Sequence, residues 1–167
     1  MRATYAPTHT VRRNSSEGWV TSIVLFPACV YYLLNRETAT ILDTASRLMF
    51  DAGRYFFGFS EGLWVYAGGA ILQILLPFAL VAFFFLHRYA FGLQVFLFWL
   101  GQNLINVSTY FIISEAAHPN RLGVRDAEHL LSGLQISEYT VHIGAVLFAV
   151  GSTCFLICLL IPRLLSR

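Results

Sequence analysis

The sequence predicts an all-α integral membrane protein with four transmembrane helices and one further amphipathic helix. Hydrophobic residues make up 57% of the 167 residues and charged residues only 12%, whereas ordinary soluble domains carry about 25% charged residues. Several apolar segments reach the length of about 20 residues that a membrane-crossing helix needs. The eleven basic residues are spread along the chain and not gathered in a patch, so we expect no nucleic-acid partner.

Four apolar segments are the expected spans. Three of them, residues 63–86, 89–114 and 139–160, meet the length requirement directly. The segment 19–34 is shorter and contains Pro27, but its aromatic end and the lack of a small-residue cleavage pattern favour an uncleaved anchor over a signal peptide. The predicted organisation is a polar leader (1–18), a single membrane domain (19–162) with an outer loop (115–138), and a short tail (163–167).

The arginine distribution predicts that both termini are cytoplasmic. Cytoplasmic loops retain positive charge, and a cytoplasmic N-terminus places Arg2, Arg12, Arg13, Arg88, Arg163 and Arg167 on the inner side with the single acid Glu17. The outer side then holds the other five arginines and the other eight acids. We expect the chain to lie in the inner membrane of a bacterium.

Residues 38–58 are expected to form the amphipathic helix. Asp43, Arg47, Asp51 and Arg54 follow one another at spacings of four, four and three, so they form one stripe of alternating charge that can neutralise itself. The expected apolar face consists of Ile41, Leu42, Ala45, Leu48, Met49, Ala52 and Phe56. Two placements remain open, flat in the outer interface or inserted in the bundle with the stripe facing protein or trapped water.

The segment 99–114 carries a stripe of amide and hydroxyl groups. Its members are Gln102, Asn103, Asn106, Thr109 and Tyr110, and Gln73 in the preceding span lies near the glycine pair Gly68–Gly69. Lipid cannot satisfy such groups, so they are expected to face another helix or a cavity. Interhelical packing is the simpler interpretation, and a ligand groove is the alternative.

Cys29, Cys154 and Cys158 lie in apolar segments and are expected to be buried thiols.

The outer loop supplies an alternative set of metal ligands. His118, Glu128 and His129, with His142 at the start of the last span, are suitable by residue type. Their spacing matches no zinc pattern. The simpler interpretation is a solvated short helix over residues 126–134.

Four landmarks between residues 48 and 144 together resemble a known family. They are FDAGRYFFGF, GGAILQILLP, FWLGQNLINVSTYF and RDAEHLLSGLQI, in this order. In order and spacing they are similar to membrane metallopeptidase-like proteins related to the site-2 protease group, in which FDAGR corresponds to the zinc-binding sequence HEAGH. The resemblance also favours the inserted position of residues 38–58.

The departures from that pattern predict a protein without zinc or catalysis. Phe50 and Arg54 stand at the two histidine positions and Asp51 at the position of the glutamate that activates water. Phenylalanine offers no lone pair, and a guanidinium stays protonated and repels a dication. We therefore expect no cofactor and a structural or binding subunit of a larger membrane assembly, surrounded by lipid and paired with a transmembrane partner or with further copies of itself.

Two alternatives to the subunit remain. One is an active membrane metallohydrolase with a shifted metal site in the outer loop. The other is a small lipid-binding, ligand-binding or transport protein that uses the amide stripe. Coupled transport is disfavoured because the sequence shows no internal repeat and no evident acid inside a span.

Overall fold

The computed structural model describes residues 15–35, 41–58, 64–112, 129–130, 132–133 and 139–165. This part of the chain forms five helices and no strand, which confirms the all-α class. The helices are α1 (Ser15–Asn35), α2 (Ile41–Phe57), α3 (Trp64–Leu86), α4 (Ala90–Ile112) and α6 (Thr140–Leu165). The short helix expected over residues 126–134 falls largely outside the described residues.

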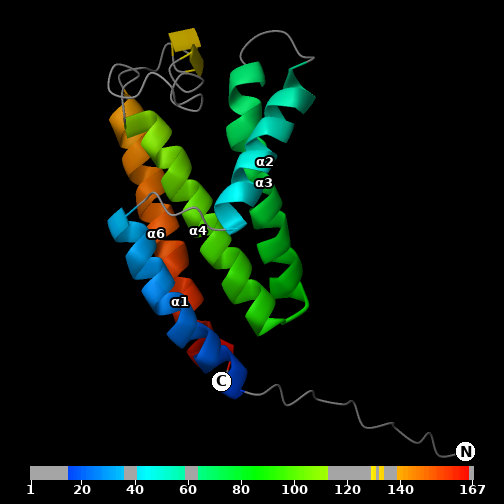
Figure 1. Cartoon of the computed structure of the whole chain (residues 1–167), viewed down its shortest axis with the longest axis vertical. Coiled ribbons are helices and arrows are strands. Elements are labelled where there is room, and N and C mark those ends of the chain that lie inside the picture. Colours follow the sequence, from blue (N-terminus) through cyan, green and yellow to red (C-terminus); the bar gives the residue numbers. More distant parts are fainter. Residues whose placement is uncertain are drawn as a thin grey trace, which may run out of the picture.

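The helices form a bundle in which α4 is the central element (Figure 1). Helix α6 runs along α4 and α1 packs beside α6, while α2 packs along α3 on the other side of α4. The start of α1, the end of α6 and the α3–α4 turn lie at the same end of the bundle. Helix α1 ends, and α2 begins, about halfway along the bundle, so neither of these two helices runs its full length.

Three helices are long and apolar enough to cross a membrane, over Ala67–Leu86, Ala90–Ile112 and Thr140–Pro162. The expected spans 63–86 and 89–114 agree with α3 and α4 to within two residues at each end. The apolar part of α1, Gly18–Leu34, is shorter than these. Three helices therefore support the prediction of a membrane protein, whereas the apolar part of α1 is shorter than the apolar part of each of these three helices.

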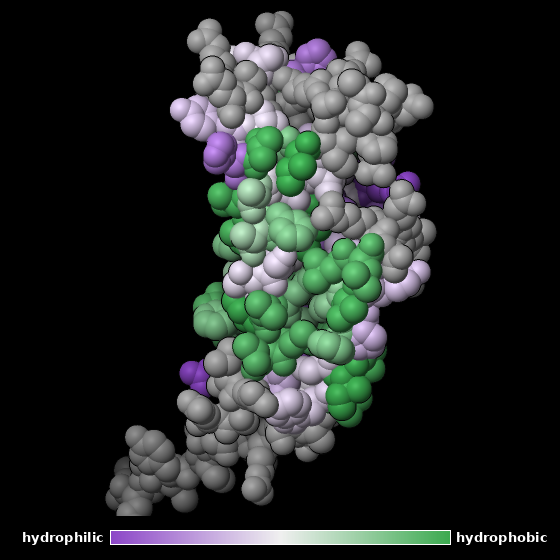
Figure 2. All heavy atoms as spheres, turned by 90° about the vertical axis from the view of Figure 1, so that its left-hand side faces the viewer, coloured by the Kyte–Doolittle hydropathy of each residue, from purple (hydrophilic) through white to green (hydrophobic). Residues whose placement is uncertain are grey.

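A hydrophobic surface covers the outer faces of the bundle. Figure 2 shows it as green residues gathered around the middle of the face that α1 and α6 share. Large apolar side chains are also exposed along α3, for example Leu75, Phe78 and Phe85. Apolar exposure on this scale is unusual for a soluble monomer and is what helices surrounded by lipid present.

The turn between α3 and α4 holds these two helices in an antiparallel hairpin. The amide of Tyr89 donates to the Phe84 carbonyl at 2.9 Å, and the amide of Arg88 donates to the Phe85 carbonyl at 3.1 Å. Arg88 has a φ of 51°, so these bonds form the Schellman motif that ends many helices. The rings of Phe84 and Tyr89 lie 5.5 Å apart and supply the apolar contact that accompanies this motif.

Glycines set the two closest helix contacts. A Cβ atom on Gly101 of α4 would lie 2.8 Å from the Gly151 carbonyl oxygen of α6, and a Cβ on Gly151 would lie 2.8 Å from the Gly101 oxygen. A Cβ on Gly53 of α2 would clash with the Gly68 carbonyl of α3. Small residues allow this approach between backbones. The first glycine pair brings α6 against α4, and the second brings α2 against α3.

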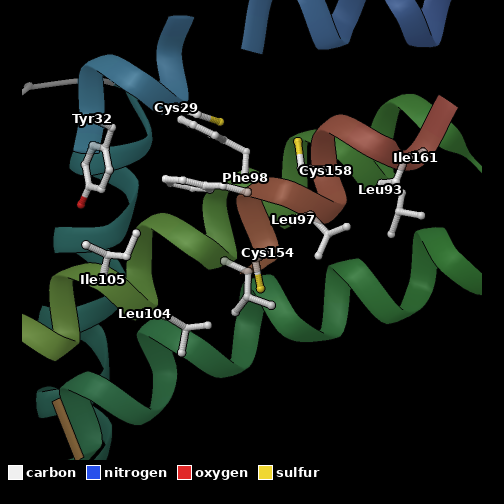
Figure 3. Close-up of a cluster of buried hydrophobic side chains, with 12 residues drawn as sticks. Cys29, Tyr32, Leu93, Leu97, Phe98, Leu104, Ile105, Cys154, Cys158 and Ile161 are labelled. Atoms are coloured by element: carbon white, nitrogen blue, oxygen red, sulfur yellow. The ribbon is translucent and has the colours of Figure 1, made fainter. Parts of the chain in front are cut away.

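The apolar core lies where α1, α4 and α6 meet (Figure 3). Phe98 of α4 stacks on Phe155 of α6 with ring centroids 5.1 Å apart. Cys29, Cys154 and Cys158 are buried and free, which confirms the expectation of buried thiols. Gln102, Asn103 and Asn106 of α4 instead face α2, α3 and the end of α1.

Candidate functional site

The polar residues of α4 are buried inside the bundle. Gln94, Gln102, Asn103 and Ser108 are 0% exposed and Thr109 is 8% exposed, while Asn106 and Tyr110 are half-buried. Gln73 of α3, predicted to belong with them, is 3% exposed. The amide groups make contacts between helices, so the site is built by following each amide to its partner.

Gln73 and Asn103 join α3 to α4. The Nε2 of Gln73 donates to the Oδ1 of Asn103 at 3.0 Å. The other two amide atoms of this pair, Gln73 Oε1 and Asn103 Nδ2, are buried and have no hydrogen-bond partner among the residues that the structure describes. The sequence brought these two residues into one predicted stripe, and the structure places them in direct contact.

The end of α1 and the start of α2 reach the same turn of α4. The hydroxyl of Tyr32 lies 2.5 Å from Asn106 Oδ1, to which it donates, and 3.3 Å from the Gln102 carbonyl oxygen. The Nε2 of Gln102 donates to Asp43 Oδ1 at 2.6 Å. The Oε1 of Gln102 is buried, with no hydrogen-bond partner in the described part of the chain.

Asp43 is a neighbour of the stripe that the sequence did not indicate. The stripe itself carries amides and hydroxyls, and α2 brings a carboxylate against it. Asp43 lies in the first turn of α2, where acids are common because they favour the positive helix end. From the sequence alone, Asp43 therefore resembles an ordinary first-turn acid. Its contact with Gln102 depends on where α2 and α4 meet in the fold.

A second contact holds α2 on α4. The indole Nε1 of Trp99 donates to Ser46 Oγ at 2.9 Å, and this hydroxyl donates to the Leu42 carbonyl at 2.7 Å. Ser46 is 2% exposed. Sequence reasoning missed this pair, because Trp99 looked like one more aromatic residue in an apolar run.

The last two members of the predicted stripe make contacts of other kinds. Thr109 donates to the Asn106 carbonyl at 2.6 Å, within α4, as threonine hydroxyls in helices commonly do. Tyr110 packs at the edge of the Phe50 ring, with ring centroids 6.0 Å apart. Among the amides of the stripe, Gln102, Asn103 and Asn106 make the hydrogen bonds between helices.

The FDAGR segment packs against α3. Phe50 is 8% exposed, and a Cβ on Gly69 would lie 2.7 Å from its ring. Gly53 supplies the close contact with Gly68. Asp51 is exposed and Arg54 is half-buried. In this arrangement the residues at positions 50 and 53 serve helix packing.

The predicted charge stripe of α2 is divided between two environments. Asp43 turns toward α4, whereas Arg47 and Asp51 lie on the exposed face and form no ion pair within the described part of the chain. Two residues of the expected apolar face point away from the bundle, since Leu48 is 60% and Phe56 70% exposed. The buried face is Ser46, Phe50 and Gly53, since glycine and serine permit the closest approach to α3 and α4.

The alternative metal ligands are not gathered in what the structure describes. His129 and His142 are exposed, and His118 and Glu128 lie outside the described residues. Among the described residues, no three histidine, cysteine or acidic side chains come together as a candidate metal site.

Gln94 is the interhelical residue that the sequence interpretation missed. Its Nε2 lies within hydrogen-bond distance of three acceptors, Ser22 Oγ (2.8 Å), the Cys158 carbonyl (3.2 Å) and the Gly18 carbonyl (3.3 Å). Its Oε1 is buried and meets no donor within the described ranges. The available signal was an amide in an otherwise apolar run, eight residues before Gln102 and therefore on a related face of the helix.

The site thus consists of one carboxylate, several amides and a phenol hydroxyl around the middle of α4. Such groups bind cations or polar molecules and pair helices; the set includes no evident nucleophile with an adjacent base. The chain matches no protein-family model, no curated protein and no solved structure.

Proposed function

We propose that the protein is a non-catalytic subunit of a membrane assembly that binds a transmembrane partner through the outward face of α2. The observation that carries this proposal is the composition of that face. Its exposed residues are Thr44, Arg47, Leu48, Asp51, Tyr55 and Phe56. Thr44, Arg47, Leu48, Asp51 and Tyr55 are linked by spacings of three and four residues, which places them along one side of the helix, and Phe56 lies beside Tyr55 at its end.

This face suits a protein partner better than lipid. Helix α2 packs along α3, one of the three apolar helices, so Arg47 and Asp51 point away from the bundle near the level of a span. An arginine or aspartate at the centre of a transmembrane helix costs about 2.5–3.5 kcal/mol on insertion. Opposite charges on a partner helix would offset that cost, and aromatic residues and arginine are enriched at protein interfaces.

The FDAGR segment supports the non-catalytic part of the proposal. Phe50 and Gly53 fill the contact with α3, so the segment keeps a helix in place by packing. In this proposal the chain derives from a metallopeptidase-like fold whose ligand positions were replaced.

The proposed topology adds a fourth crossing of the membrane to those of α3, α4 and α6. Helices α1 and α2 together make this fourth crossing, both termini are cytoplasmic, and the membrane is the bacterial inner membrane. The common end shared by the start of α1 and the end of α6 is consistent with this topology.

Site-specific photocrosslinking in native membranes tests the interface. A photoreactive amino acid at Leu48 is expected to give one discrete crosslinked product, and the same group at Phe78, exposed on the apolar face of α3, is the matched control. Reversing the charge pattern with Arg47→Asp and Asp51→Arg should remove the product at position 48. The mass of the product separates a second copy of the chain from a different protein. Products of equal yield at both positions, unaffected by charge reversal, would contradict the proposal.

Elemental analysis of bound zinc tests the expectation that the protein has no catalytic zinc site. The detergent-purified chain is expected to carry no stoichiometric zinc. A full equivalent of zinc that disappears in Asp51→Ala would show that FDAGR still contributes to a metal site. Zinc lost with His129→Ala or His142→Ala would instead favour the shifted-site hydrolase.

A further inference from the structure

The outward face of α2 carries one positive and one negative charge that are not paired with each other. Arg47 and Asp51 are both exposed and stand four residues apart, but they form no ion pair within the described part of the chain. We propose that the partner of this face is a second copy of the same chain, and that Arg47 of each copy pairs with Asp51 of the other. This pairing rests on the partner surface of the proposed function and names the occupant that the proposed function leaves open.

The two charges lie at the level of a membrane span. Gly53 of α2 is in close contact with Gly68, near the start of the Ala67–Leu86 span. Asp51 precedes Gly53 by two residues and is therefore close to the same level. Helix α2 begins about halfway along the bundle (Figure 1), so Arg47 lies one turn deeper than Asp51. Ionisable side chains at such levels commonly pair with one another.

The order of these two residues disfavours an ion pair inside the helix. Residues four apart are neighbours on a helix surface, but an acid that precedes a base forms a better pair than the reverse order, in agreement with the helix dipole. In α2 the arginine comes first and the aspartate second. Both side chains therefore remain available for charged groups on another helix.

The outward face of α2 is complementary in charge to a copy of itself. Two copies with the same orientation in the membrane are related by a twofold axis along the membrane normal, so their α2 helices run in the same direction. Arg47 of one copy then lies about 6 Å along the helix axis from Asp51 of the other, an offset that the long arginine side chain can span. Because each contact across a twofold axis is repeated in reverse, the second ion pair forms as well. The two pairs together carry no net charge.

The spacing along this face is that of a seam between two parallel helices. Spacings of four, three and four residues connect Thr44, Leu48, Asp51 and Tyr55. This is the repeat with which parallel helices pack along each other. Leu48 is 60% exposed, and Phe56 beside Tyr55 is 70% exposed, so both offer apolar surface to a second helix. The face therefore combines an apolar seam with charges that a second copy neutralises.

Crosslinking with matched charge changes tests the second copy. A photoreactive amino acid at Leu48 is expected to give a product of twice the chain mass that joins copies carrying two different epitope tags. In native membranes, where unchanged copies predominate, Arg47→Asp/Asp51→Arg in the photoreactive chain should lower the yield at least about tenfold, because like charges then face each other. Where every copy carries this reversal, the yield should return to that of the unchanged chain. A different protein keeps its own charges, so its product would stay absent in both membranes.

A second set of variants gives the same test with its own control. Arg47→Asp alone leaves only acids at the two positions and Asp51→Arg alone only bases, so neither should give the product when it is the only form present. Co-expression of the two forms should restore it between them. A product of twice the chain mass that returns in neither experiment would overturn the ion pairs. A product of another mass would overturn the second copy and leave the partner surface of the proposed function in place, whereas no product at Leu48 would contradict both.

Discussion

Gln94 and Gln102 lie on the same helix and are equally buried, yet their surroundings differ. Gln94 faces α1 and α6 and shares its Nε2 among three neutral oxygens. Gln102 faces α2 and directs its Nε2 to one carboxylate. In neither does the Oε1 have a hydrogen-bond partner among the described residues. The first arrangement joins three helices through neutral groups, and the second joins α4 to a carboxylate of α2. The same side chain therefore makes a neutral or a charge-assisted contact according to the partner that the fold supplies.

The largest effect is expected from a change that separates α4 from α6 and so disrupts the Gln94 region. A side chain in Gly101→Leu would begin 2.7 Å from the Phe155 ring and 2.8 Å from the Gly151 carbonyl. We expect a loss of about 3 kcal/mol in unfolding free energy, at the upper end for overpacking, because backbone cannot move aside. Thermal unfolding in detergent measures it. Ala82→Leu, at an exposed position of α3, is the control and should change little.

The second-largest loss of unfolding free energy is expected at Gln102, and the same substitution at Gln94 tests directly whether the two glutamines differ. Gln102→Leu is expected to cost about 2 kcal/mol, because it leaves the Asp43 carboxylate without this donor. Gln94→Leu should cost about 1 kcal/mol, since membrane hydrogen bonds between neutral groups are worth about 0.6 kcal/mol on average and at most about 1.7. Denaturation of both variants under identical conditions gives the order. If Gln94→Leu proved the more harmful, the distinction between the two sites would be wrong.

A smaller effect is expected for the bond between α3 and α4. Gln73→Leu and Asn103→Leu should each destabilise the fold by leaving the partner amide buried and unpaired. The double variant is expected to cost less than the two single changes together, with a coupling of about 1 kcal/mol. A double-mutant cycle on unfolding free energies measures this coupling. Strict additivity would show that the two amides do not depend on each other.

The smallest effect on stability is expected at the outward face of α2. Arg47→Gln and Asp51→Asn alter exposed side chains that form no ion pair within the described residues. The unfolding free energy of the isolated chain should stay within about 0.5 kcal/mol. The crosslink at Leu48 should weaken in the same variants. A large loss of stability without any change in crosslinking would place these residues in the fold and not at an interface.

Most of the helix positions were predictable because the signal is local. The expected span 63–86 differs from α3 by one residue, since the apolar run itself sets the length of the helix. The burial of Gln73, Gln102 and Asn103 also followed from their position in apolar segments. The sequence left open which side of α2 packs inward, and the structure buries Ser46, Phe50 and Gly53 while Leu48 and Phe56 are exposed. In a membrane bundle the smallest residues pack inward, and large apolar ones can point outward.

The sequence by itself determined that this chain is helical and apolar enough for a membrane, and that its amides need partners inside the protein. Those conclusions follow from chain length, hydropathy and the need of each polar group for a hydrogen bond. Only the tertiary structure decided that Asp43 meets Gln102 and that Gln94 meets Ser22. These contacts join residues 59 and 72 positions apart. Such pairs depend on how closely glycine contacts let the helices approach, and no local pattern along the chain encodes that distance.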